Sequence, residues 1–267
     1  MTPTVDLAKA LNARNPDPSF ENKVILVTGA SRGIGKSLAI SLGQRGATVI
    51  LMARNEEALN TVYDQIVEAG GPTPVIVATD FTNLTAEGAR ELAEQIGETF
   101  GRLDGLAHVG ALLGGREPIQ THRPAQWADV MAVNLNAVFY LTQALLPWLD
   151  QSPAGRIVMA TSSVGYEVNP YWGAYAVSKA GLEMFTAMLA EELDTTSSTR
   201  VLTVNPGGTR TAMRAEAKPG EDPASLPGPD LVAESFVFGL TEEAGAFHGQ
   251  RLNAREWMAS VGTWPAL

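Results

Sequence analysis

The sequence predicts a single α/β domain in which a mainly parallel sheet of about seven strands is flanked by helices on both faces. From Val24 onward, short apolar and β-branched runs alternate with longer amphipathic segments. The short runs are continuously hydrophobic, as strands covered on both faces require. A glycine-rich turn joins the first run to the first helical segment. Such alternation gives right-handed crossovers and therefore a doubly wound sheet.

Most elements of this sheet can be placed along the chain. Strands are expected at 24–27, 48–52, 75–78, 103–107, 156–160 and 201–205. The first helix follows the glycine turn, where Ile34, Leu38 and Leu42 repeat at four-residue spacing. Further helices are expected at 56–69, 87–100, 126–149 and 173–193.

Residues 23–267 are expected to form one domain, because doubly wound sheets often reach this length without dividing. Residues 1–22 precede the first strand and are expected to be an N-terminal surface extension. Near the other end, the Pro- and Gly-rich segment 218–229 cannot continue a helix. With the residues just before it, this segment is expected to form a substrate loop at 211–229.

Composition argues against several classes of function. The 267-residue chain has no cysteine, and its three scattered histidines do not indicate a metal site. A formal net charge of −10 argues against nucleic acid as a partner, since a phosphate backbone is bound by Lys and Arg clusters. No apolar run reaches the roughly 18 residues of a membrane span, and the N-terminus does not resemble a signal peptide. A cytoplasmic protein without metal, membrane or nucleic-acid partners is expected.

The glycine-rich turn 28–35, Thr-Gly-Ala-Ser-Arg-Gly-Ile-Gly, follows a strand and opens a helix. Its first glycine permits the tight turn, the second lets backbone approach a phosphate, and the third lets the helix pack close to the sheet. The N–H groups at the positive end of the helix then face the pyrophosphate of a dinucleotide. A strand-to-helix turn without a ligand is the alternative. The residues expected at the phosphates are Gly29, Ser31, Arg32, Gly33, Ile34 and Gly35.

Tyr175 and Lys179 stand four residues apart, and Tyr175 is thirteen residues after Ser162. Residues four apart on a helix share a face, so Lys179 can lie beside Tyr175. A nearby ammonium, together with the positive charge of an oxidised nicotinamide, favours the phenolate and lowers the pKa of tyrosine from its usual value of about 10. Hydride transfer to a ketone leaves an oxyanion that needs a proton, which such a tyrosine can supply. An exposed i,i+4 pair and a serine that merely caps a turn are the alternatives.

The Gly-x-x-x-Gly-x-Gly spacing behind Thr28, followed by Tyr175 and Lys179, resembles the short-chain dehydrogenase/reductase family over residues 23–253. The resemblance implies a Rossmann-type fold. It also implies that Tyr175 is the acid and base of the reaction, and that Lys179 tunes it and hydrogen-bonds the nicotinamide ribose.

Two further residues match family positions. Ser162, in preference to its neighbour Ser163, matches the serine that hydrogen-bonds the reacting oxygen. Asn134 matches a helix asparagine that supports a proton-relay water through a helix distortion. An ordinary buried amide is the alternative for Asn134.

The cofactor predicted from this resemblance is NADP(H). In the family, an acidic residue that ends the second strand binds the adenosine 2′-hydroxyl and selects NAD. The matching position here is Ala53, and Arg54 follows it. Arg offers planar, charge-assisted hydrogen bonds to a 2′-phosphate, and Arg32 adds a second cation on the same side. A solvated pair of surface arginines is the alternative.

Other cofactor contacts are implied by the resemblance alone. Asp80, followed by Phe81, matches a family aspartate near the adenine, although an aspartate at a strand end can also cap a turn. After the sixth strand, Pro206 and Gly207 are followed by Thr209 and Thr211, which match positions that hold the nicotinamide carboxamide; turn chemistry alone is the alternative for Pro206 and Gly207.

The resemblance breaks after the fourth strand. The family usually carries Asn-Ala-Gly there, whereas residues 108–111 are His-Val-Gly-Ala. Gly110 still lets the backbone pass close to the ribose. The lost asparagine amide is expected to weaken the support of the middle of the sheet and to slow catalysis.

The predicted function is an NADP(H)-dependent oxidoreductase that transfers a hydride between nicotinamide and a small-molecule carbonyl or secondary alcohol, with ketone reduction favoured. A methyltransferase on the same fold would not need Tyr175 and Lys179. A non-catalytic dinucleotide sensor is the main alternative. Arg210 and Arg214 are expected to be solvated, with an acidic substrate group as the alternative. The expected substrate pocket has apolar and aromatic walls from 211–229, Val164, Tyr166, Asn169, Tyr171 and Trp172.

A homo-oligomer is also expected. In the family, the helices matched to 126–149 and 173–193 pair across two-fold axes. The second helix carries more apolar surface than one face of a sheet covers. Either a symmetric dimer or a tetramer is predicted, with the tetramer favoured.

Overall fold

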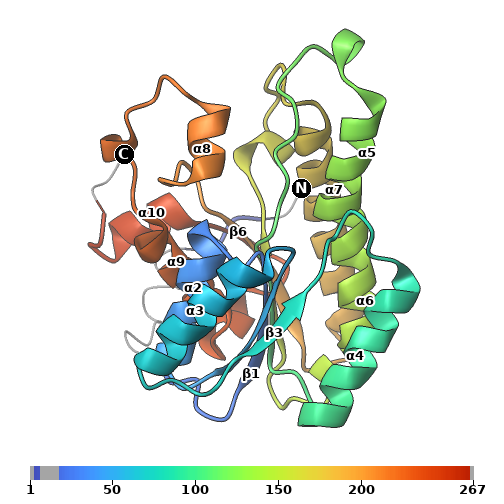
Figure 1. Ribbon diagram of the computed structural model, residues 1–267, viewed down its shortest axis with the longest axis vertical. Helices are drawn as coiled ribbons and strands as arrows, with labels where there is room; N and C mark the ends of the chain where they lie inside the picture. The colour runs from blue at the N-terminus through green and yellow to red at the C-terminus, as the bar shows by residue number, and fades with distance from the viewer. Residues whose placement is uncertain (1–2, 7–17, 265–267) are drawn as a thin grey trace.

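A computed structural model, which describes residues 3–6 and 18–264, shows a seven-stranded sheet in the order β3-β2-β1-β4-β5-β6-β7 (Figure 1). Every neighbouring pair in it is parallel. The predicted doubly wound α/β fold is therefore confirmed. The strands are β1 (Val24–Thr28), β2 (Thr48–Ala53), β3 (Val75–Ala78), β4 (Gly105–His108), β5 (Arg156–Ala160), β6 (Arg200–Asn205) and β7 (Arg251–Asn253).

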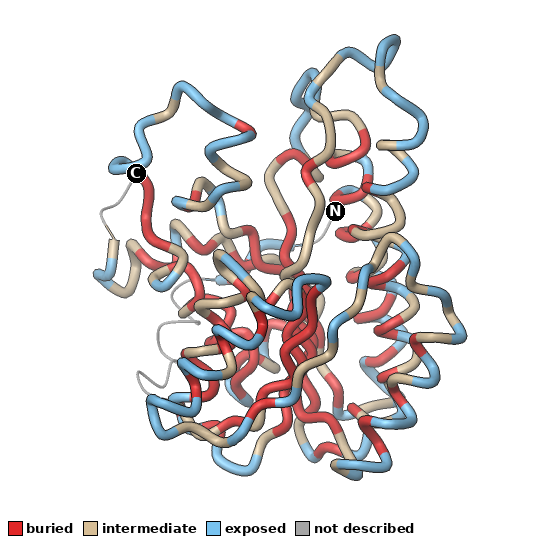
Figure 2. Tube along the Cα trace, viewed as in Figure 1, coloured by how far each residue is buried: buried red, intermediate tan, exposed pale blue. Residues whose placement is uncertain are grey.

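Helices cover both faces of the sheet, which explains the continuous hydrophobic runs. Successive strand side chains point to opposite faces. Along β1, Ile25 and Val27 join one core cluster, whereas Val24 and Leu26 join the other. Buried residues accordingly fill the middle of the molecule (Figure 2). The first cluster packs α2 (Gly33–Gln44), α3 (Glu56–Glu68), α9 (Pro229–Gly239) and α10 (Ala254–Ser260), and the second packs α4 (Ala86–Phe100), α6 (Ala137–Leu149) and α7 (Gly173–Leu193).

The helix predicted at 126–149 is interrupted by a π-helical turn. It consists of α5 (Pro124–Met131), the turn η2 (Ala132–Asn136) and α6. π-turns inside α-helices occur frequently at functional sites. By length and composition, Pro124–Leu149 is also apolar enough to cross a membrane. Its apolar residues Leu141 and Leu145 are fully buried in the core against the sheet, so this is a core helix.

The described part of the N-terminal extension packs into the domain. We expected residues 1–22 to lie on the surface, but Val5 and Phe20 are each only 4% exposed and belong to the core. The N–H of Val5 donates to the carbonyl of Arg251 at 2.8 Å, and Thr4 forms a parallel bridge with the same residue. This segment therefore lies beside β7. The sequence did not predict β7, because a strand of three residues is too short to show an apolar period.

The carboxyl ends of the strands meet at one edge of the sheet, below two projecting segments. One carries α8 (Ala212–Ala217) and η4 (Pro223–Ser225), within the predicted substrate loop 211–229. The other follows β4 and leads into α5 (Figure 1). The strand order reverses between β1 and β4, and ligands of doubly wound sheets bind above such a reversal.

Candidate active site

The glycine turn after β1 leaves no room for side chains. Gly29 has a φ of +69°, and a Cβ there would lie 2.5 Å from the Cα of Gly110. A Cβ on Gly35 would lie 2.3 Å from the carbonyl oxygen of Gly29. The helix α2 that begins at Gly33 has no side-chain cap and no acidic residue in its first turn. Its N–H groups therefore face the space above the turn, as anion binding requires.

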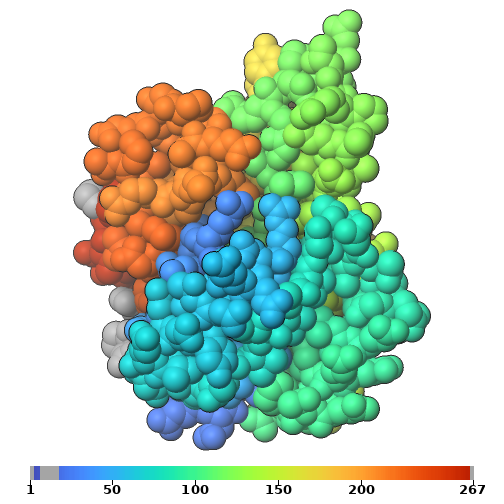
Figure 3. All heavy atoms as spheres, viewed as in Figure 1, coloured from blue at the N-terminus to red at the C-terminus, as the bar shows by residue number. Residues whose placement is uncertain are grey.

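A cavity of about 440 Å³ opens above this turn, where Figure 3 shows the surface hollowed between the segment with α8 and the segment after β4. Of the predicted cofactor residues, Tyr175, Lys179, Pro206, Gly207 and Thr209 do not line it. Instead, the Thr209 hydroxyl donates to the carbonyl of Pro206 at 3.3 Å. The predicted residues that do line the cavity are Gly29, Ser31, Arg32, Gly33, Ile34, Gly35, Arg54, Asp80, Phe81, Gly110 and Thr211.

The sequence missed part of this lining. Val109, Leu112, Val133 and Met213 also contribute to the cavity and give it apolar walls. Their position was hidden because they belong to three different segments with no common spacing. The departure from the family's Asn-Ala-Gly at residues 108–111 could have drawn attention to Val109.

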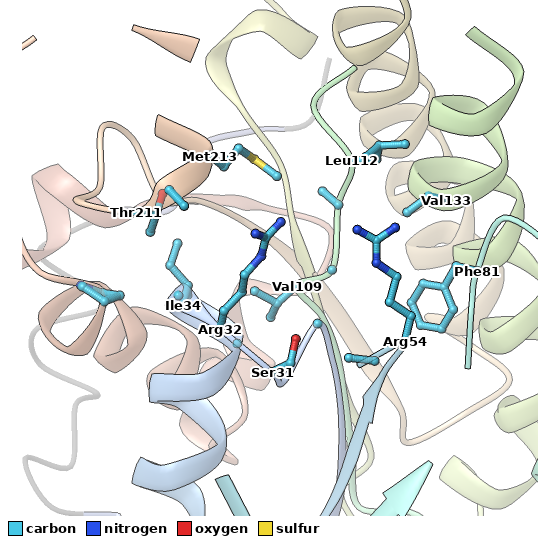
Figure 4. A pocket seen from close by; sticks show the side chains of 18 of the residues that line it. Ser31, Arg32, Ile34, Arg54, Phe81, Val109, Leu112, Val133, Thr211 and Met213 are labelled. Atoms are coloured by element: carbon cyan, nitrogen blue, oxygen red, sulfur yellow. The ribbon is translucent and has the colours of Figure 1, made fainter. Parts of the chain in front are cut away.

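Two arginines enter the cavity. Figure 4 shows Arg32 rising from the glycine turn and Arg54 from the end of β2, with both guanidinium groups extending into the same space. Both side chains are exposed. The position before Arg54 is the small residue Ala53, which brings no carboxylate to the end of β2. Two cations at this position suit a phosphate group, although Asp80 is near enough for the charge of Arg54 to help lower its pKa.

Asp80 caps the turn that follows β3. Its Oδ1 accepts hydrogen bonds from the backbone N–H of Thr82 at 3.0 Å and from the Thr82 hydroxyl at 2.8 Å. These hydrogen bonds lower the pKa of Asp80 below its usual value. Asp80 also lines the cavity, so the turn cap and a place beside a ligand are compatible.

The chain after β4 is held by hydrogen bonds, although its sequence departs from the family pattern. The Thr28 hydroxyl accepts from the N–H groups of Val109 at 3.1 Å and Gly110 at 3.2 Å. His108 is buried, and its Nε2 lies 3.0 Å from the Thr142 hydroxyl. Burial, helped by the charge of Lys179, lowers the pKa of His108 to about 3, so the ring is neutral. The middle of the sheet thus has polar support without the amide, and slower catalysis stays a prediction.

Asn134, in the π-turn, connects this segment to α7. Its Oδ1 accepts from the N–H of Leu112 at 2.7 Å, and its Nδ2 donates to the Leu112 carbonyl at 2.9 Å. The same Nδ2 donates to the Ser178 hydroxyl at 3.1 Å, which in turn donates to the carbonyl of Tyr175. Asn134 is only 1% exposed. The amide therefore fixes the π-turn against the helix that carries Tyr175.

Ser162, Tyr175 and Lys179 come together beside the end of β5 and are not part of the cavity lining. Ser162 lies just after β5 and hydrogen-bonds the phenol of Tyr175. The ammonium of Lys179 lies 5.7 Å from the centre of the Tyr175 ring and donates to the carbonyl of Ala160 at 2.7 Å. Both Tyr175 and Lys179 are buried. The neighbouring Ser163 instead begins the short helix η3 (Ser163–Gly165).

Burial decides the ionisation of this group. It raises the pKa of Tyr175 to about 12, although the hydrogen bond with Ser162 acts in the opposite direction and lowers this pKa. Burial also lowers the pKa of Lys179 to about 8, against a raising by the charge of Glu183. The prediction that the Tyr-Lys pair lowers the pKa of Tyr175 is therefore wrong for the chain by itself. Desolvation of the phenolate outweighs the ammonium, which is turned to Ala160.

Comparison with known proteins now places the chain. The family described as short chain dehydrogenase matches residues 23–222. The chain is a short-chain dehydrogenase. It is 43% identical over 236 residues to the uncharacterized oxidoreductase YciK of Escherichia coli, a match that covers 88% of this chain and 93% of the relative.

Solved structures agree with this assignment. A short chain dehydrogenase from Salmonella enterica serovar Typhi is 42% identical, with a TM-score of 0.87 and coverage of 91% of this chain and 99% of that one. A putative short chain dehydrogenase from Escherichia coli CFT073, complexed with NADPH, is also 42% identical, with a TM-score of 0.86 and coverage of 91% and 100%. The chain is thus an oxidoreductase by family.

The surroundings of Tyr175 in this short-chain dehydrogenase are apolar and aromatic. The Trp172 ring lies 5.8 Å from that of Tyr175, centre to centre, and the Arg116 guanidinium stacks over Trp172 at 4.5 Å. Arg116 also donates to the carbonyl of Ala217 at the end of α8, which links the two segments above the sheet. The sequence did not indicate Arg116. The apolar residues around Tyr175 are Leu113, Val164, Trp172, Met213 and Ala217.

Other predicted pocket residues lie elsewhere. Tyr166 turns away to accept a hydrogen bond from Asn205, and Tyr171 is 58% exposed. Asn169 is also exposed. Arg214 pairs with Glu221 through two contacts of 2.5 and 2.6 Å, whereas Arg210 is exposed and lines the cavity. Only Arg210 is thus placed to meet an acidic group.

Proposed function

We propose that the protein is an NADP(H)-dependent oxidoreductase that transfers a hydride between nicotinamide and a carbonyl or secondary alcohol, with ketone reduction favoured. The observation that carries this proposal is a neutral, buried Tyr175 phenol, hydrogen-bonded to Ser162, beside a cavity with a phosphate-binding turn. The relatives from Shigella flexneri and Escherichia coli CFT073, complexed with NADP and NADPH, support the choice of cofactor.

The residues of the cavity fit a dinucleotide phosphate. The glycine turn closes tightly because a Cβ at Gly29 or Gly35 would meet the backbone of Gly110 or Gly29. This tight turn brings the N-terminus of α2 to the cavity, which suits a pyrophosphate. Arg32 and Arg54 would hold the 2′-phosphate, and Asp80 with Phe81 would flank the adenine. When bound, the nicotinamide supplies the hydride. The remaining contacts rest on the family resemblance: the ribose at Gly110 and Lys179, and the carboxamide at Thr209 and Thr211 after the Pro206-Gly207 turn. Of these residues, Gly110 and Thr211 line the cavity.

In ketone reduction, the protein's own task is to bind the carbonyl and deliver a proton. Ser162 hydrogen-bonds the carbonyl oxygen together with Tyr175, and the Tyr175 Oη gives up its proton as negative charge develops there. A phenol whose pKa is raised by burial is fully protonated at neutral pH and ready to donate. Lys179 favours the phenolate left behind, and Asn134 supports the route by which the proton is replaced.

NADPH consumption distinguishes the enzyme from a dinucleotide sensor. We would measure binding by NADPH fluorescence, and turnover against quinones, ketoesters, acyl-thioester mimics, steroids and sugar ketones. Binding with turnover of at least one carbonyl is the expected result. Tight binding without turnover of any of them would favour the sensor instead.

The assembly we propose is a homo-oligomer, a symmetric dimer or tetramer with the tetramer favoured. Four large apolar side chains on α6 and α7 are exposed in the isolated chain, namely Phe139 (41%), Val177 (46%), Met184 (58%) and Met188 (53%). Apolar surface gathered on neighbouring helices is typical of an interface. Light scattering should give a multiple of 28.3 kDa, and a stable monomer at micromolar concentration would contradict the proposal.

A further inference from the structure

Glu183 is a buried carboxylate that the proposed mechanism does not use. It lies on α7 one turn after Lys179, and the two residues are only 7% and 3% exposed. Residues four apart on a helix share a face. Burying a charged group is costly unless an opposite charge compensates it. A buried carboxylate at this spacing can therefore compensate the charge of the buried ammonium through space, while the Lys179 Nζ itself donates to the Ala160 carbonyl.

Arg251 holds Glu183 from the far side. Its Nη1 lies 3.3 Å from the Glu183 Oε2, and its guanidinium stacks 3.7 Å from the centre of the Tyr166 ring. The backbone of Arg251 is also fixed, because its N–H donates to the carbonyl of Pro3 and its carbonyl accepts from Val5. The carboxylate is thus anchored to β7 while its helix carries Lys179.

The other titratable groups near Lys179 do not supply a negative charge. His108 is neutral, and its pKa is lowered partly by the charge of Lys179 itself. Burial raises the pKa of Tyr175 and of Tyr166, so both phenols are neutral as well. Arg251 is cationic and faces Glu183. Within residues 3–6 and 18–264, Glu183 is the group whose charge raises the pKa of Lys179 against desolvation.

We propose that Glu183 is a positioning residue, which keeps Lys179 in its ammonium form on the carbonyl of Ala160 and is itself held in place by Arg251. The catalytic part played by Lys179 rests on the proposed function, but the ionisation of Lys179 does not. Without the carboxylate, the buried ammonium would lose its counter-charge and release its proton at lower pH.

The experiment follows the ionisation of Lys179 directly. The chain has only five lysines, so protein made with ¹³Cε-labelled lysine gives few NMR signals, and Lys179→Met identifies the one of interest. The cofactor-free protein is titrated from about pH 6 to about pH 11. In the wild type, the Lys179 signal should titrate below the other four. In Glu183→Gln, its midpoint should fall by about one further unit, since an opposite charge nearby shifts a pKa by about 1–3 units.

Three variants make the result specific. Glu183→Asp keeps the charge and should hold the midpoint close to the wild-type value. Glu192→Gln removes an exposed carboxylate from the same helix and should leave the midpoint unchanged. Arg251→Gln removes the group that holds Glu183 in place and should lower the midpoint, which tests the arrangement even where Glu183→Gln fails to fold.

An unchanged Lys179 midpoint in a folded Glu183→Gln protein would overturn the proposal, and so would a raised midpoint in Arg251→Gln. Because no cofactor or substrate is present, these outcomes are independent of the turnover assay. NADPH affinity provides a second readout. It should weaken at pH 9 relative to pH 7 more in Glu183→Gln than in the wild type, since a neutral Lys179 hydrogen-bonds the ribose less strongly.

Discussion

The two halves of the cleft obtain their properties in different ways. In the cofactor half, formed by the glycine turn and the end of β2, bare backbone sets the shape, and a Cβ on Gly29 or Gly35 would overlap its neighbours. The charged side chains there, Arg32 and Arg54, are exposed. In the catalytic half, formed by Ser162 and α7, the working side chains are buried and their pKa values are shifted.

This difference has a practical consequence. Changes to the exposed arginines of the cofactor half should act locally and alter binding alone. Changes in the catalytic half should alter the ionisation of neighbouring groups, because charges interact more strongly away from water. The expected effects below run from the largest to the smallest.

The largest effect should come from Tyr175→Phe. Loss of the phenolic oxygen removes the proton donor, so turnover of a confirmed carbonyl substrate should fall by at least about 10²–10⁴-fold. NADPH affinity, measured by fluorescence on the same preparation, should stay close to wild type, since the cofactor half is untouched. Near wild-type turnover would show that Tyr175 is not the proton donor. It would also contradict the idea that changes in the catalytic half affect chemistry while those in the cofactor half affect binding.

Gly29→Ala tests whether bare backbone sets the cofactor half. The new Cβ would meet the backbone of Gly110, and the φ of +69° is unfavourable for alanine. NADPH affinity should fall by at least about tenfold, because the two sides of the cradle must move apart. Gly70→Ala is the matched control, since Gly70 has a φ of +82° but no neighbour within 4 Å. That variant should lose some stability and keep its affinity, and equal affinity losses in both would contradict the steric argument.

Arg54→Ala should separate the two nicotinamide cofactors. Loss of a charge-assisted hydrogen bond costs about 1.5–3 kcal/mol, or about ten- to a hundredfold in affinity. The loss should affect NADPH and leave NADH almost unchanged, as titration with both cofactors would show. Arg90→Ala, which removes an exposed arginine on α4, is the control. Equal wild-type affinities for NADPH and NADH would refute the assignment of Arg54.

The smallest effect concerns His108 and acid stability. Burial depresses its folded pKa to about 3, below the unfolded value of about 6.5. The unfolded chain therefore binds the additional proton, so this contribution is complete above about pH 6.5 and is lost as the pH falls toward 3. Between pH 7 and pH 5 it amounts to about 2 kcal/mol of the free energy of unfolding. His108→Asn should reduce the stability loss over that interval in urea titrations, and an equal loss in both proteins would show that His108 does not titrate as its burial requires.

Much of the fold and part of the site could be predicted from the sequence. The strand at 75–78 and the helix at 173–193 match the structure because each has a clear apolar pattern. The glycine turn was recognisable because its residues are contiguous. By contrast, the short strand β7 depends on its pairing with β6, and the burial of Val5 depends on a contact between the two ends of the chain. No local pattern records such a pairing.

The sequence by itself determined the order of strands and helices, the glycine cradle and the spacing of Tyr175 and Lys179, since these depend on neighbouring residues and the period of each element. The tertiary structure decided how deeply those residues lie and what surrounds them. Burial raised the Tyr175 pKa where the Tyr-Lys spacing predicted a lowering. The pairing of Glu183 with Arg251 joins residues 68 positions apart. Desolvation and long-range charge depend on distances in space, and only the folded chain sets those distances.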